Sequence, residues 1–164
     1  MKNNVHRVAF LGVCTAVALI LAYVEMLLPP LFPAVPGIKL GLPNIILVFI
    51  LYRFGVRDAA TVSLMRLLLV WFLFGSTMSF LYSLAGAALS LLVMALLRKA
   101  DLLSPVGVSV AGAILHNVGQ ILVAILLLGT TQIAYYLIVL TVTGIIAGVV
   151  IGFCGGIAIK TIKI

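Results

Sequence analysis

Long apolar runs fill most of the chain, and short polar or Pro-rich segments separate them. In the hydrocarbon core of a bilayer every backbone N–H and C=O group must be bonded internally, so an apolar run of about 20 residues there forms a helix. The runs predict an all-α integral membrane protein, a six-transmembrane-helix bundle in a single domain over residues 1–164. The predicted helices cover about 8–28, 42–54, 59–74, 79–97, 106–128 and 133–159.

The composition supports lipid as the main solvent of this protein. Hydrophobic residues make up 65% of the chain and charged residues 8%, whereas a soluble domain carries roughly 25% charged residues. The first apolar run follows Lys2, His6 and Arg7 and continues to Leu28, which is longer than the apolar part of a signal peptide. We therefore expect this run to be the first transmembrane helix.

Lysine and arginine residues gather at alternate ends of the predicted helices. If the N-terminus is inside, eight of them lie at inner ends, Lys39 lies in an outer loop, and Arg66 lies within a helix. Cytoplasmic loops carry such an excess of basic residues, so the pattern predicts a multi-pass protein of the cell membrane with both termini cytoplasmic (N-in/C-in). The net charge of +7 is then explained by topology, and nucleic acid is not an expected partner. The eight inner residues are Lys2, Arg7, Arg53, Arg57, Arg98, Lys99, Lys160 and Lys163.

Glycines recur at every fourth position of the last predicted helix, at Gly144, Gly148, Gly152 and Gly156. Lipid provides no hydrophobic force between helices, so close helix contact depends on small residues. We expect one stripe along the whole helix, with Gly148 and Gly152 against a neighbouring helix. A sliding or subunit surface is the alternative interpretation.

Several polar side chains fall inside the predicted membrane segments. Arg66 lies roughly 12 Å and His116 roughly 15 Å from the inner ends of their helices, counting 1.5 Å per residue, and an ionisable group at that depth suggests a functional site. No acidic residue is expected at mid-membrane depth, since Glu25 is near the outer end of the first helix, so an anionic ligand is the natural counter-ion of Arg66 if Arg66 is buried without a protein partner. Two interpretations remain open, a structural polar network and a ligand cavity that opens outward. The candidate ligand-binding residues are Lys39, Asn44, Arg66, Ser79, Tyr82, Ser83, His116, Asn117 and Gln120.

Four segments, in order along the chain, resemble the family of Gx transporters, also described as heptaprenyl diphosphate synthase component I. They are Pro36–Asn44, Ser63–Leu68, Ser79–Gly86 and His116–Gln120. That family is in turn similar to the S components of energy-coupling-factor (ECF) vitamin transporters, which are six-helix bundles of this size. The resemblance implies a ligand site near the outer side, under the loop between the first two helices. It also implies that small residues on the first helix, here Ala9, Gly12 and Ala16, contact a coupling subunit.

Catalytic and metal chemistry have little support in the residues. The acidic residues Glu25, Asp58 and Asp101 are isolated, without the DDxxD cluster that would hold Mg²⁺ for prenyl diphosphate synthesis. Cys14 and Cys154 form no CxxC. The chain alone is therefore not expected to be an enzyme, and neither a metal, a cofactor nor a catalytic residue is predicted.

Two hypotheses of function follow. The first is a substrate-binding and uptake subunit of S-component type for a small anionic, quinone-like, isoprenoid or vitamin-like molecule. It would need a coupling subunit and ATPases on other chains, because no GxxxxGK[ST] phosphate loop is present. The alternative is a non-catalytic membrane subunit in heptaprenyl diphosphate or menaquinone side-chain biosynthesis, or in the flavin- or quinone-linked membrane electron transfer with which the family is also associated.

Overall fold

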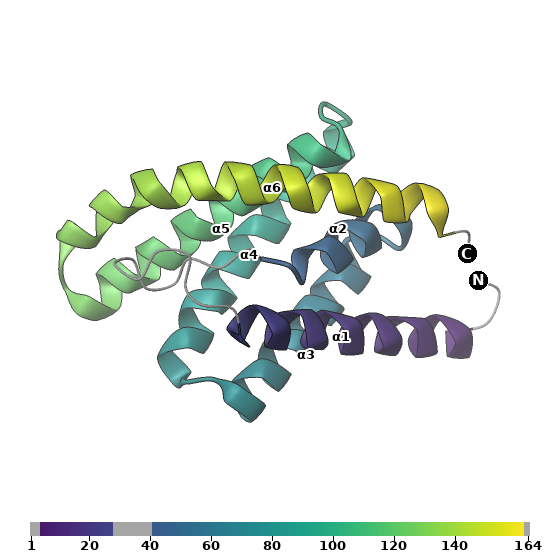
Figure 1. Ribbon diagram of the computed structural model, residues 1–164, viewed down its shortest axis with the longest axis horizontal. Coiled ribbons are helices and arrows are strands. Elements are labelled where there is room, and N and C mark those ends of the chain that lie inside the picture. The colour runs from purple at the N-terminus through teal and green to yellow at the C-terminus, as the bar shows by residue number, and fades with distance from the viewer. Residues whose placement is uncertain (1–3, 28–40, 163–164) are drawn as a thin grey trace.

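The computed structural model describes residues 4–27 and 41–162, and within them the chain is helical without strands (Figure 1). This confirms the all-α prediction. A short 3₁₀ helix, η1 (Thr131–Tyr135), precedes the last α-helix, and each predicted range overlaps one α-helix. The α-helices of the described residues are α1 (Asn4–Leu27), α2 (Asn44–Arg53), α3 (Val56–Phe74), α4 (Thr77–Ala100), α5 (Pro105–Leu128) and α6 (Tyr136–Thr161).

Four helical segments are long and apolar enough to cross a membrane: α1, α4, α5 and the segment Thr131–Thr161, which joins η1 to α6. The chain is therefore a multi-pass membrane protein. The other two α-helices differ from these in length or charge. At 10 residues, α2 is about 15 Å long, half the thickness of a hydrocarbon core, and α3 carries Arg57, Asp58 and Arg66 within its 19 residues.

Helix α2 forms the centre of the core despite its length. The side chains from Leu47 to Leu51 are all buried, and Val48, Ile50 and Leu51 are fully so. This continuous apolar run has no polar face because α2 contacts α1, α3 and α6 around its circumference. Burial on all sides thus accounts for a sequence without helical periodicity.

Helix α6 packs closely on α5 through its glycines. A Cβ atom added at Gly148 would lie 2.7 Å from Val110 Cα, and one added at Gly152 would lie 2.6 Å from Val106 Cα. Both distances are too short for any side chain, so the backbones are in direct contact. The predicted close approach of Gly148 and Gly152 to a neighbouring helix is confirmed.

The glycine stripe is shorter than the sequence predicts. A Cβ atom at Gly156 would have nothing within 4 Å, so the expectation of one stripe along the whole helix is wrong at this position. Gly152 already lies against Pro105, the first residue of α5. Beyond this point α5 has no backbone left for α6 to contact.

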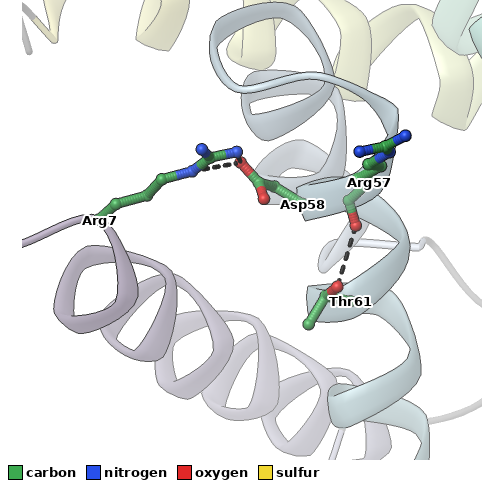
Figure 2. A network of polar contacts seen from close by, with 4 residues as sticks. All are labelled: Arg7, Arg57, Asp58 and Thr61. Carbon is green, nitrogen blue, oxygen red and sulfur yellow. Dashed lines mark hydrogen bonds and ion pairs between the residues drawn. The ribbon is translucent and has the colours of Figure 1, made fainter. Parts of the chain in front are cut away.

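Arginines join the helices at one end of the molecule. Arg7 of α1 donates to Asp58 of α3 through Nε at 3.0 Å and Nη2 at 2.6 Å (Figure 2). Arg98 of α4 donates to the Tyr52 carbonyl in the last turn of α2 at 3.1 Å. The start of α1 and the end of α6 also lie at this end of the molecule (Figure 1).

Arg53 makes the corresponding contact with α6. Its Nη2 donates to the carbonyls of Ile159 and Ile162, at 2.7 and 2.8 Å. The last carbonyls of a helix have no partners inside the helix, and a cation there also interacts favourably with the helix dipole. Arg53 therefore connects α2 to the last turn of α6.

Candidate functional site

A cavity of about 90 Å³ lies inside the bundle, between α1, α3, α4, α5, α6 and the residues that begin α2. A space of this size holds more than one water molecule. Most of its apolar lining comes from small or aliphatic side chains. The polar side chains that line it are Glu25, Asn44, Arg66, Ser83, His116, Asn117 and Gln120.

Six of the nine ligand-binding candidates line this cavity, namely Asn44, Arg66, Ser83, His116, Asn117 and Gln120. Ser79 and Tyr82 are not among the lining residues. Ser79 lies in the first turn of α4, where its backbone N–H donates to the Ser76 hydroxyl at 3.2 Å, and Tyr82 is turned about 100° around the helix from Ser83. Lys39 lies outside the described residues.

Arg66 places a positive charge in the cavity wall. Its Nε atom is buried and has no hydrogen-bond partner within the described part of the chain. A buried donor without a partner loses the hydrogen bond it would make to water, at a cost of about 1–3 kcal/mol or more for a charged group. Arg66 therefore lines the cavity and has a donor that is unused within the described residues.

Glu25 lies in the same cavity, and the sequence analysis did not place it there. Glu25 lines the cavity together with Arg66. The lining of the cavity therefore includes an acidic side chain as well as Arg66. Depth was counted along parallel helices, but α3 runs obliquely to α1 (Figure 1), and the two helices pack together.

The start of α2 holds the Glu25 carboxylate in place. Glu25 Oε1 accepts a hydrogen bond from the backbone N–H of Gly41, just before the helix. Gly41 has a φ of +73°, and a Cβ atom there would lie 3.0 Å from Asn44 Nδ2, so glycine suits this turn on two grounds. A carboxylate at a helix N-terminus is further stabilised by the helix dipole.

Glycines make room for the polar groups on α5. Asn117 Nδ2 donates to the Leu140 carbonyl of α6 at 2.6 Å, and a Cβ atom at Gly144 would lie 2.8 Å from that nitrogen. A Cβ atom at Gly86 of α4 would lie 2.8 Å from the His116 carbonyl and 3.0 Å from its ring. The small residues that bring the helices together thus also determine where the polar residues lie.

The small residues of α1 divide between two faces. Cys14, Ala18 and Ala22 are buried against the bundle. Residues two positions apart are turned about 200° around a helix, so Gly12 and Ala16 lie opposite this buried face. Ala9, Gly12 and Ala16 are accordingly exposed, and a Cβ atom at Gly12 would have nothing within 4 Å.

Sequence reasoning missed Glu25 and Gly41 as parts of the site. A signal for Glu25 was present, because it is three residues after the buried Ala22 and both therefore lie on one side of α1. Gly41 follows Lys39 in a segment that the sequence analysis assigned to a loop. No three His, Cys, Asp or Glu side chains come together as metal ligands in residues 4–27 and 41–162.

Comparison with protein families identifies the family of this chain. The model of the family described as heptaprenyl diphosphate synthase component I matches residues 14–157, which cover the described chain from Cys14 in α1 almost to the end of α6. No curated protein and no solved structure matches the chain. Every cavity-lining residue lies within the matched region, whereas Ala9 and Gly12 precede it.

Proposed function

The chain belongs to the heptaprenyl diphosphate synthase component I family, and on that premise we propose that it is the membrane-embedded, ligand-binding subunit of a multi-subunit system. One observation carries the proposal. Arg66, whose buried Nε has no hydrogen-bond partner in the described residues, lines a cavity together with six other polar side chains. An arginine with an unpaired buried donor in a cavity wall suits a ligand with a carbonyl or carboxylate acceptor, since guanidinium offers donors and no acceptor.

The proposed topology has six membrane segments with both termini in the cytoplasm. The arginines assigned to the inner side support it, because Arg7, Arg53 and Arg98 make their contacts at one end of the bundle. The short helix α2 would begin within the membrane, at the level of the cavity. A reporter fused after Ile164 should be active only in the cytoplasm, and activity on the outer side would refute this topology.

If the protein is an uptake subunit, we propose that α1 contacts its partner protein. Ala9, Gly12 and Ala16 form an exposed surface that the bundle does not use, and the resemblance to S components makes a coupling subunit, with its ATPases, the expected partner. An exposed glycine lets another helix approach closely in lipid. This surface supports a complex in which the ligand-binding subunit docks through α1.

Arg66→Met tests ligand binding directly. The substitution keeps much of the side chain's bulk and removes the charge, so the amount of small molecule that co-purifies with the protein should fall at least tenfold, a factor worth about 1.4 kcal/mol. Arg57→Met is the matched control, because Arg57 is exposed on the same helix and does not line the cavity. Equal retention by both variants would remove the ligand-binding role.

The family description favours a second candidate, in which the chain supports a soluble prenyltransferase. The chain would not itself hold the Mg²⁺ of that reaction, since Glu25, Asp58 and Asp101 are far apart in sequence. Co-purification decides between the candidates. Recovery of an ATPase and its coupling subunit supports uptake, whereas recovery of a prenyltransferase supports the biosynthetic role.

A further inference from the structure

Asn117 joins α5 to α6 through the nitrogen of its side-chain amide. Asn117 Nδ2 donates to the Leu140 carbonyl at 2.6 Å. A backbone carbonyl accepts hydrogen bonds and cannot donate them, so the amide can face Leu140 only with its nitrogen. Because Asn117 also lines the cavity, its amide oxygen, Oδ1, is the atom that remains to serve a ligand.

Gly144 of α6 makes this orientation possible. A Cβ atom at Gly144 would lie 2.8 Å from Asn117 Nδ2, so any other residue there would push the amide away from Leu140. Gly148 has a different neighbour, because a Cβ atom there would meet the α5 backbone at Val110 Cα. The two glycines therefore serve different purposes: Gly148 sets the distance between the helices, whereas Gly144 sets the position of a side chain.

We propose that Asn117 is a specificity-determining residue of the ligand site and Gly144 its positioning residue, and that the ligand carries an N–H or O–H group which donates to Asn117 Oδ1. This inference rests on the proposed ligand-binding function and adds a requirement to it. Alcohols, amines and amides with an N–H group belong to the class that fits. Ethers, esters and oxidised quinones, which have no such hydrogen, do not.

Small side chains surround this amide. Ala113 lies one helical turn before Asn117 on α5, and Ala147 lies one turn after Gly144 on α6. All four residues line the cavity, and a Cβ atom at Gly144 would lie 3.6 Å from the Ala113 carbonyl oxygen, so these turns face each other. The wall around Asn117 therefore leaves its amide accessible to a ligand group.

Hydrogen bonding makes the requirement for a donor selective. An amide oxygen in a cavity wall can bond to water, and a ligand that displaces this water must replace its hydrogen bond. A ligand with an N–H or O–H group does so, whereas an analogue without one leaves Oδ1 unpaired, which is unfavourable for a buried polar atom. Sites that bond a polar hydrogen of their ligand therefore reject analogues that lack it.

The first experiment identifies the molecule that the protein retains. Small molecules are extracted from wild-type protein and from Arg66→Met, both purified under mild conditions, and compared by mass spectrometry. The species most enriched in wild type, by at least tenfold, should carry an N–H or O–H group, detected as a mass increase after exchange into deuterated solvent. A species without such a group would overturn this inference and leave the ligand-binding function standing. If no species reaches that enrichment, the proposed function itself fails.

The second experiment makes the same change at two glycines of α6. Gly144→Ala should fold, because the atom it meets is the end of a side chain that can turn away, and should lower the retained amount of that species at least tenfold. Gly148→Ala is the matched control: its Cβ atom meets backbone, so it should lower the thermal unfolding midpoint and retain the species normally per mole of folded protein. Normal retention by Gly144→Ala would overturn the inference. A tenfold loss in both variants would do the same, because the loss would then follow from helix packing.

A double-mutant comparison shows whether Gly144 acts through Asn117. Asn117→Ala removes the amide and should by itself lower retention at least tenfold, which also tests the inference if Gly144→Ala does not fold. Gly144→Ala should lower the thermal unfolding midpoint in the wild-type background and raise it in the Asn117→Ala background, because alanine favours a helix over glycine and no amide remains to be displaced. Equal shifts in the two backgrounds, or normal retention by Asn117→Ala, would overturn the inference.

Discussion

Two regions of the bundle hold their helices together in different ways. Helices α4, α5 and α6 meet backbone to backbone, as at Gly119, where an added Cβ atom would lie 2.8 Å from the Ala85 carbonyl. Helices α1, α2 and α3 are instead joined by side chains, among them the Arg7–Asp58 ion pair and the bond from Glu25 to the residues before α2. The cavity lies where the two regions meet.

The difference assigns close packing to one region of the molecule and exchangeable polar contacts to the other. Backbone contact depends on shape alone and leaves no room for adjustment, because one added methyl group produces a clash. Charged and polar contacts can exchange partners with a ligand. We infer that the glycine-packed region is the rigid wall of the site and that α1 and α2 form the adjustable wall.

The largest expected effect comes from filling the glycine contacts. Gly148→Leu or Gly152→Leu should destabilise the protein by about 3 kcal/mol or more, because overpacking a tight contact typically costs about 1–3 kcal/mol and these contacts are to backbone that cannot move aside. Thermal unfolding in detergent measures the change. Gly156→Leu is the control and should have little effect, since nothing lies within 4 Å. If all three variants were equally stable, the glycine contacts would not hold α6 to α5, and the difference between the two regions would be refuted.

The second prediction weakens the region joined by side chains. Arg7→Met leaves the Asp58 carboxylate, whose side chain is 12% exposed, without its partner, and should cost about 2 kcal/mol. Adding Asp58→Asn should recover part of the loss. Arg57→Met is the control, because the Arg57 side chain points away from the ion pair in Figure 2. If Arg7→Met and Arg57→Met behave alike, this ion pair does not hold α1.

A smaller and local effect is expected at the end of α6. Arg53→Met removes two hydrogen bonds to the carbonyls of Ile159 and Ile162 at an exposed position, so the loss should be about 1 kcal/mol. Hydrogen exchange should increase in the last turn of α6 and stay unchanged around Gly148. An increase spread along the whole helix would mean that the end contact, rather than the glycines, holds α6.

The smallest effect on stability is expected at Gly12. Gly12→Trp should leave the unfolding midpoint within error, because no atom lies within 4 Å of the added Cβ, and should abolish assembly with a partner. Ala18→Trp is the control on the opposite face, where Ala18 has no exposed surface, and it should unfold the protein. Normal assembly of Gly12→Trp would remove α1 as the docking surface.

Much of the candidate site could be predicted from the sequence. Asn44, Arg66, Ser83, His116, Asn117 and Gln120 were chosen because a polar side chain in an apolar helix needs a partner, and all six line one cavity. Glu25 was missed because its depth was estimated as if helices were parallel rods. Ser79 and Tyr82 were chosen from one helical face with Ser83, but the cavity ends at Ser83.

The sequence by itself determined that the chain is helical and belongs in a membrane. In lipid an apolar run must form a helix, because only then are its backbone N–H and C=O groups bonded. This follows from each run by itself, whichever helices it later packs against. Which helix meets which was decided by the tertiary structure. The glycines at every fourth position of α6 look equivalent in the sequence, yet Gly152 lies against α5 and Gly156 does not, because contact depends on where the neighbouring helix begins. That Glu25 and Arg66 line one cavity likewise depends on how α1 and α3 pack together, which no single helix encodes.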